Sequence, residues 1–215
     1  RNMIKTFTTK QSNNSFQTNL EKGKKGESKL TQMLKSHYPE PDYHIHKWDY
    51  NTVLGKEMER AGVDHTVTNR KTGFKIHIQC KDNLKLNTRY GSYASLELYH
   101  GNWGRGDKVG RFLEGTEAHR WYHFDEYTND AIYYDYPKQL NYIWNHCLKQ
   151  TGEFDKPKNV KENKNVYVWK AHDGDHTLFR LNINDELFDG RFTYLKYDKS
   201  SEAWTATKFQ SKYVK

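Results

Sequence analysis

An acid, an amide and a lysine are spaced along residues 62–81 so that a single hairpin would gather them. Both arms of this stretch alternate apolar and polar side chains, which is typical of half-buried strands. A hairpin that closes near Gly73 would place Asp64 beside Gln79 and Lys81 on one polar face. The spacing therefore predicts one small cluster built from both arms.

The apolar positions of the two arms predict the opposite, buried face of the hairpin. In the second arm this face consists of Phe74, Ile76, Ile78 and Cys80. In the first arm we expect it to consist of Val63, His65 and Val67.

The three polar side chains suit metal-assisted chemistry on a phosphate. Carboxylate and amide oxygens can hold a hard cation such as Mg²⁺. The metal can polarise a phosphate and lower the pKa of a bound water. A lysine can orient that water or neutralise charge that develops on the phosphate. An ordinary hairpin with a solvated polar face is the alternative interpretation.

The sequence Gly-Val-Asp ending at Asp64, followed by Gln79-Cys80-Lys81, resembles the motif of the PD-(D/E)xK nuclease superfamily. The resemblance is to the Gln-x-Lys variant of Mrr-type and phage-encoded nucleases. It implies a Mg²⁺-dependent deoxyribonuclease, for which Mn²⁺ can substitute. Asp64, the Gln79 side-chain oxygen and the Cys80 carbonyl would hold the metal, and Lys81 would handle the attacking water. Gln79 stands where an acid is commoner.

A helix is predicted over residues 23–38, and residues 3–22 read as a loose polar lead-in. Its apolar stripe consists of Leu30, Met33, Leu34 and His37, and prolines 39 and 41 end it. Glu27 lies in the first turn, after a basic, glycine-containing stretch. The resemblance, which extends here to Holliday-junction resolvases, implies a catalytic acid at Glu27. Favourable interaction with the helix dipole is the alternative explanation.

The charge of the chain favours a polyanionic partner. Lysine and arginine total 35 against 27 acids, a net charge of +8. We expect DNA as the partner, with phosphate contacts from Lys24, Lys25, Lys85 and Arg89. Solubility alone could also explain the charge. A catalytically weak DNA-binding module, an RNA-directed nuclease and a homodimer all stay open.

The remaining elements are expected to complete a mixed sheet. Strands are predicted over 43–48, 93–99, 118–125 and 131–135, joined by connections over 49–61, 82–91 and 101–111. Glu57 and Glu59 read as acids of a solvated loop, and Glu97 as a further candidate acid. A helix is expected from Pro137, with the apolar stripe Leu140, Ile143, Trp144 and Cys147.

The C-terminal part is predicted to be β-rich. A connector over 153–165 leads to an appendage over 166–215, with strands at 166–171, 177–183, 192–197 and 203–208. His172 and His176 flank an Asp-Gly turn, and turn chemistry explains that segment better than a metal site does. The order of elements, together with the resemblance, implies one α/β domain over 1–215. Its nuclease core, over about 20–150, would be a restriction-endonuclease-like mixed sheet flanked by helices.

Two cysteines, Cys80 and Cys147, make no disulfide framework and favour a reducing, cytoplasmic setting. The sequence has no apolar run long enough to span a membrane, so we expect no membrane partner.

Overall fold

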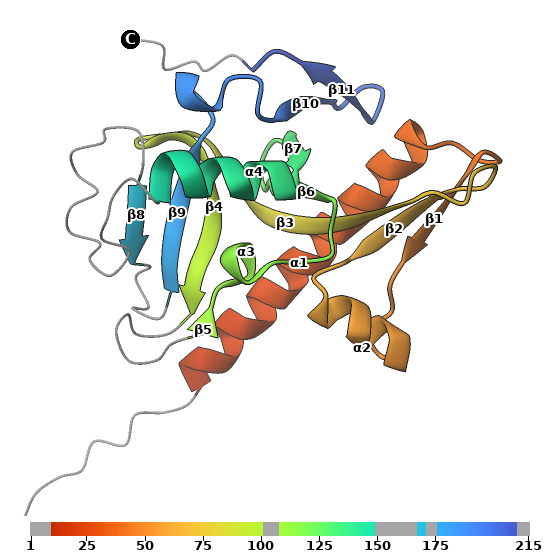
Figure 1. The fold of residues 1–215 in the computed structure, drawn as a ribbon, viewed down its shortest axis with the longest axis horizontal. Helices are drawn as coiled ribbons and strands as arrows, with labels where there is room; N and C mark the ends of the chain where they lie inside the picture. The colour runs from red at the N-terminus through yellow and green to blue at the C-terminus, as the bar shows by residue number, and fades with distance from the viewer. Residues whose placement is uncertain (1–9, 101–107, 149–166, 171–175, 210–215) are drawn as a thin grey trace, which may run out of the picture.

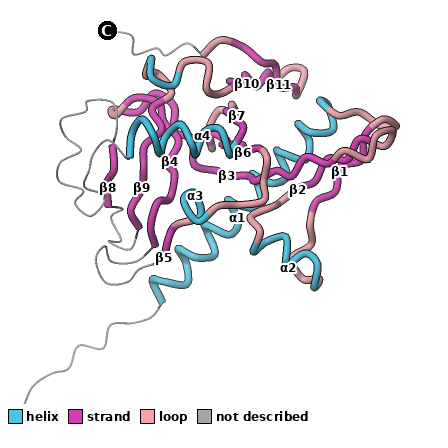
Figure 2. Tube along the Cα trace, in the orientation of Figure 1, coloured by secondary structure: helices cyan, strands magenta, loops and turns pink. Residues whose placement is uncertain are grey.

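In the computed structural model of the chain, the described residues are 10–100, 108–148, 167–170 and 176–209. Their strands belong to one mixed sheet, and helices pack on both of its faces. Figures 1 and 2 show this curled sheet with α1 and α4 crossing different parts of it. The α/β class predicted from the sequence is confirmed.

The helices differ in length. They are α1 (Lys10–His37), α2 (Val53–Arg60), α3 (Arg111–Glu114) and α4 (Tyr136–Ile143), the last continued by a π-helical turn (Trp144–Leu148). A 3₁₀ turn (Glu186–Phe188) lies near the C-terminus.

The strands of the first two thirds of the chain are β1 (Tyr43–Lys47), β2 (His65–Asn69), β3 (Lys75–Thr88), β4 (Gly91–His100), β5 (Lys108–Val109), β6 (Arg120–Asp125) and β7 (Ala131–Asp135). The later strands are β8 (Tyr167–Lys170), β9 (His176–Asn182), β10 (Thr193–Asp198) and β11 (Ala203–Thr207).

The sheet runs in the order β11-β10-β7-β6-β3-β4-β9-β8, with β1 and β2 attached beside the first half of β3. Its pairs are antiparallel except β3 and β6, which run parallel. The C-terminal strands extend both ends of the sheet, because β9 pairs with β4 and β10 pairs with β7.

The predicted hairpin is present as β2 and β3. His65 lies opposite Ile78 and Val67 lies opposite Ile76. The turn closes at Gly73, whose φ of +70° is strained for a side chain with a Cβ. Two residues depart from the predicted buried face: Val63 packs with the core on the other side of the sheet, and Phe74 is 64 % exposed.

Helix α1 covers one face of the sheet through Leu30, Met33 and Leu34, which are fully buried. The predicted helix is therefore confirmed, except that His37 of its stripe is exposed. The lead-in prediction is wrong from Lys10 onward, so Glu27 lies in the interior of the helix and not in its first turn. Residues 10–22 are mostly polar and contain no proline, and adding turns to an already packed helix costs little.

The connections were predicted less well than the strands. Residues 53–60 form α2, whose first turn is capped by the Thr52 hydroxyl accepting from Gly55 N at 3.0 Å. The predicted loop over 82–91 is wrong, because β3 continues to Thr88. Leu84 is buried there, opposite Ala94 of β4.

The later elements mostly follow the prediction. Strands β6 and β7 and the start of α4 lie where expected, but Trp144 is 42 % exposed and does not join the apolar stripe. The connector over 153–165, most of the connection over 101–111 and the turn at His172 lie outside the described residues. None of the described helices is long and apolar enough to cross a membrane.

Candidate functional site

The β2–β3 hairpin places Asp64 beside Gln79, and both side chains are buried. Asp64 is 8 % exposed and Gln79 is 6 % exposed. Gln79 Nε2 donates to Asp64 Oδ2 at 2.8 Å, and the Cys80 backbone N–H donates to the same oxygen at 2.5 Å. Two consecutive residues of β3 therefore hold one carboxylate oxygen.

A residue that the sequence did not single out holds the other oxygen. The Tyr50 hydroxyl donates to Asp64 Oδ1 and lies 3.3 Å from the carbonyl oxygen of Val63. Burial and the nearby carboxylate raise the pKa of Tyr50 far above its usual range, so the hydroxyl stays a donor. Tyr50 belongs to the connection before α2, which has no periodic pattern that could have revealed the contact.

Burial dominates the electrostatics of Asp64 and raises its pKa. Hydrogen bonds from Tyr50 and from the Cys80 backbone, together with the charge of Lys81, act in the opposite direction, and the charge of Glu27 raises the pKa further. The ionised carboxylate is therefore costly where it lies, and a bound cation would relieve that cost.

Helix α1 brings Glu27 to the same region. Gly26 packs against β3 so closely that a Cβ there would lie 3.6 Å from Cys80 Sγ and 3.3 Å from Asp82 Cβ. Glu27, the next residue, forms an ion pair with Lys47 at the end of β1, with Oε2 2.8 Å from Nζ. A small residue in α1 thus allows an acid to approach the hairpin.

A cavity of about 930 Å³ opens beside these groups. Its lining comes from α1, the end of β1, the connection after it and α2: Gly23, Lys24, Glu27, Lys47, Trp48, Asp49, Tyr50, Asn51 and Glu59. Of the predicted residues, Lys24 and Glu27 line this cavity. Asp64 does not line it, but accepts a hydrogen bond from Tyr50, which does. Lys25 is exposed on the same helix.

Lys81 lies opposite His123 of β6, with its Nζ 5.7 Å from the centre of the Trp121 ring. A bulge follows at once, since two residues of β3 oppose one residue of β6 before the pairing resumes at Leu84. His123 is fully buried between Asn83 Oδ1 at 2.6 Å and the Tyr134 hydroxyl at 2.8 Å. This network supports the strand segment that carries Lys81.

The other predicted residues lie apart from the cavity. Lys85 forms an ion pair with Glu126 at 3.6 Å, and the Arg89 guanidinium stacks over Tyr90 at 4.5 Å. Glu97 lies on β4, opposite β9. These three side chains are not among those that line the cavity beside Asp64.

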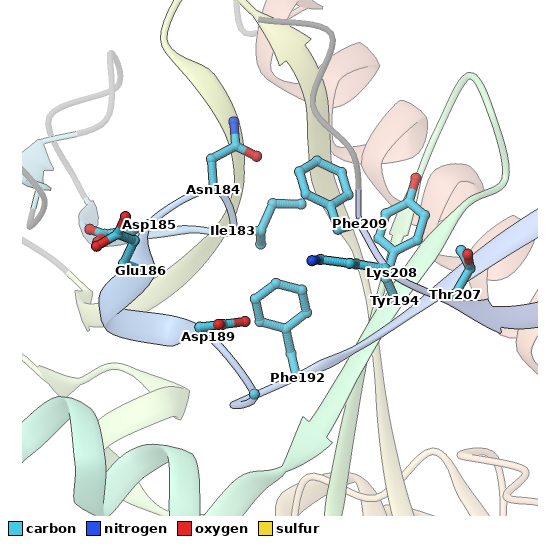
Figure 3. A pocket seen from close by; sticks show the side chains of 11 residues that line it. Ile183, Asn184, Asp185, Glu186, Asp189, Phe192, Tyr194, Thr207, Lys208 and Phe209 are labelled. Atoms are coloured by element: carbon cyan, nitrogen blue, oxygen red, sulfur yellow. The ribbon is translucent and has the colours of Figure 1, made fainter. Parts of the chain in front are cut away.

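A second cavity, of about 390 Å³, lies between the 3₁₀ turn and strands β10 and β11 (Figure 3). Apolar side chains such as Phe192 and Phe209 line it together with acids, and the Lys208 side chain extends into it (Figure 3). None of the predicted site residues lines this cavity.

No group of three or more His, Cys, Asp or Glu side chains within the described ranges is placed to hold a metal. Further protein ligands for a metal beside Asp64 would therefore be the Gln79 amide oxygen or a backbone carbonyl, with water or phosphate oxygens completing the set. No protein-family model, curated protein or solved structure matches this chain.

Proposed function

We propose that this protein is a Mg²⁺-dependent nuclease that hydrolyses the phosphodiester bonds of DNA. The observation that carries this proposal is the buried Asp64 carboxylate, joined to Gln79 and the Cys80 backbone within reach of the charges of Glu27 and Lys81. A buried acid with a raised pKa beside a cavity is characteristic of functional sites.

The oxygen donors at this point fit a small, hard cation. Gln79 Nε2 lies 2.8 Å from Asp64 Oδ2 and 3.5 Å from the Cys80 carbonyl oxygen. Turning the amide over exchanges its nitrogen and oxygen at nearly the same positions. Neighbouring ligand oxygens around Mg²⁺ are separated by about 3 Å, as its octahedral geometry requires. Bound there, the metal would polarise the phosphate and lower the pKa of a water.

The protein side chains would position the reacting groups. Tyr50 holds Asp64 Oδ1, which leaves Oδ2 to face Gln79 and Cys80. The Lys81 ammonium supplies positive charge near Asp64, where it would neutralise charge developing on the phosphate. Glu27, which lies on α1, would bind a water molecule that is coordinated to the metal.

The arrangement of elements supports the finer fold assignment that we propose, a restriction-endonuclease-like core. Helix α1 precedes a three-stranded antiparallel ribbon of β1, β2 and β3, and β6 returns parallel to β3. Asp64 directly precedes β2, and Gln79 and Lys81 lie on the part of β3 that pairs with this return strand.

One observation favours a second candidate, a catalytically weak DNA-binding module. Gln79 presents its amide nitrogen to Asp64, and an amide held in that orientation offers no oxygen to a metal. The two candidates differ in whether Mg²⁺ supports hydrolysis.

The test is incubation with supercoiled plasmid, linear duplex, single-stranded DNA, branched DNA and RNA, with Mg²⁺ or with a chelator. We expect Mg²⁺-dependent cleavage of DNA by the native protein. Asp64→Asn and Lys81→Ala should each abolish cleavage, whereas Asp198→Asn, at an exposed acid that ends β10, should not. Absence of cleavage by the native protein would reject the nuclease, and full activity of either site variant would reject the assigned site.

A further inference from the structure

Strands β1, β2 and the first half of β3 form a three-stranded ribbon that is covered by α1 on one face. Ile45, Val67 and Ile76 belong to the core beneath α1. Figure 1 shows the ribbon projecting from the rest of the sheet alongside this helix. Residues directly opposite in antiparallel strands share a face, so the residues that alternate with these three lie on the other face.

That other face carries imidazole and ammonium groups. Its strand positions are His44 and His46 of β1, Thr66 and Thr68 of β2, and Lys75 and His77 of β3. His44, His46 and Lys75 are exposed, and the ring of exposed His119 stacks on His77 with ring centres 5.3 Å apart. None of the six strand positions holds a carboxylate. We call His44, His46, Lys75, His77 and His119 the histidine face.

Hydrogen bonds order the inner part of the histidine face. The Thr66 hydroxyl lies 2.9 Å from His77 Nδ1 and accepts from Trp48 Nε1 at 2.9 Å. His46 packs edge-on against the Trp48 ring, with centres 4.3 Å apart. These contacts limit the side-chain freedom that a bound ligand would otherwise have to remove.

The histidine face leads directly to the candidate site. Asp64 and Gln79 are the next positions on the same face of the ribbon, two residues from Thr66 and from His77. Trp48 also lines the cavity that contains Glu27. A ligand lying across the ribbon would therefore arrive at the edge of this cavity, beside buried Asp64, without leaving this face.

We infer that the histidine face binds the sugar–phosphate backbone of duplex DNA and guides it to Asp64. Imidazole and ammonium donors bind phosphate oxygens, and such contacts position a duplex without reading its sequence. Exposed Lys71 at the tip of the hairpin adds positive charge along the same path, whereas Arg70 beside it forms an ion pair with Glu40 at 3.9 Å. The Glu117 carboxylate, whose charge influences His77, is an opposing negative charge. This inference rests on the proposed function and assigns its substrate-docking surface.

The test is the affinity for a short labelled duplex, measured by fluorescence anisotropy at fixed salt and pH in a chelator, so that no cleavage occurs. The variants His44→Glu/His46→Glu and Lys75→Glu place negative charge on the face. We expect each to weaken binding by about tenfold or more, and Lys75→Gln to lower the salt slope by about 0.9. The matched controls are Lys138→Glu, at an exposed position of α4, and His146→Glu, at an exposed position of the π-helical turn that follows it. Both should bind the duplex as the native protein does.

The outcomes separate the two proposals. If the native protein cleaves DNA but the variants of the histidine face bind the duplex as tightly as the control variants do, the proposed docking surface is wrong and the proposed nuclease activity is unaffected. If the native protein neither binds nor cleaves DNA, both proposals fail. Tighter binding of RNA than of duplex DNA, lost in the same variants, would overturn DNA as the occupant of this face.

Discussion

At the residue scale, the organising feature is a carboxylate that is buried yet fully hydrogen-bonded. Asp64 accepts from Tyr50, Gln79 and the Cys80 backbone. These bonds compensate for lost hydration without supplying a full positive charge, so burial still raises the pKa of Asp64. The raised pKa means that folding is penalised as pH rises and Asp64 ionises, and a cation would remove this penalty.

Gln79 provides the sharpest test of that idea. In Gln79→Glu, two carboxylates would lie about 3 Å apart, which disfavours ionisation of both. We expect a lower melting temperature without Mg²⁺ and a larger Mg²⁺-induced rise than in the native protein. A concentration 100-fold above the dissociation constant would contribute about 2.7 kcal/mol. We also expect Gln79→Glu to need less Mg²⁺ for half-maximal cleavage and Gln79→Ala to be nearly inactive.

Thermal unfolding with and without Mg²⁺ measures this effect independently of activity. Gln139 is a buried glutamine on α4, 2 % exposed, so Gln139→Glu is the matched control. It should be destabilised to the same extent with and without Mg²⁺. If Gln79→Glu behaves like this control, Gln79 is not a metal ligand.

His123 should make stability depend on pH. Burial lowers the pKa of His123 to about 3, so the folded protein keeps it neutral while the unfolded chain protonates it below about 6.5. The contribution of neutral His123 to the free energy of unfolding is fully present above pH 6.5. It is lost as the pH falls towards 3, at about 1.4 kcal/mol per pH unit. His123→Gln cannot titrate and should show a shallower loss of stability between pH 7.5 and 5 in urea unfolding. A loss equal to that of the native protein would contradict this account, and exposed His146→Gln serves as the control.

At the element scale, close packing of backbone against side chains positions the site. Gly62 precedes Asp64 with a φ of +70°, and a Cβ there would lie 2.6 Å from Thr116 Cγ2 and 2.9 Å from Gln79 Oε1. The entry into β2 therefore requires glycine both for its conformation and for the space occupied by Gln79.

We predict that Gly62→Ala is destabilising by about 1–3 kcal/mol and also disturbs Gln79. Gly73 separates the two causes, since it has the same φ of +70° with nothing within 4 Å of its Cβ position. Gly73→Ala should show the conformational cost alone and keep the Mg²⁺ dependence of the native protein. Urea unfolding and Mg²⁺ titration of both variants measure the difference. If the two variants have the same free energy of unfolding and the same Mg²⁺ dependence, the contact between residue 62 and Gln79 affects neither stability nor the site.

At the scale of the whole molecule, the chain has a net charge of +8, and acids and donors occupy different places around the candidate site. Glu27, Asp49 and Glu59 line the cavity beside Asp64, whereas the adjoining histidine face presents donors. This separation suits a substrate whose phosphates lie on the histidine face and whose scissile bond lies beside Asp64, where the proposed metal would bind.

Affinity for DNA should consequently fall steeply with salt. A protein that neutralises Z phosphates has a slope of log K on log salt of about −0.9Z. We expect a slope corresponding to several phosphates when duplex binding is measured from low to physiological salt. An uncharged backbone analogue of the same sequence should show almost no slope. Equal slopes for the two ligands would contradict electrostatic docking.

Sequence alone determined the parts of the fold that local burial patterns specify. Leu30, Met33 and Leu34 predicted the buried face of α1, because one helical face must pack on the sheet. Alternation in residues 62–81 predicted the hairpin, and the period of two then placed Asp64 and Gln79 on one face. Register and face are local consequences of the pattern.

The tertiary structure decided everything that depends on segments brought together from a distance. Tyr50 reaches Asp64 from an aperiodic connection, and Lys47 reaches Glu27 from another element. The second half of β3 was predicted as a loop, since its pairing with β4 depends on a partner rather than on its own composition. The alternating histidines of β1 are visible in the sequence, but their exposure depends on which face α1 covers. Hydrophobic periodicity indicates which face of a segment is buried, whereas contacts between distant segments depend on the path of the whole chain.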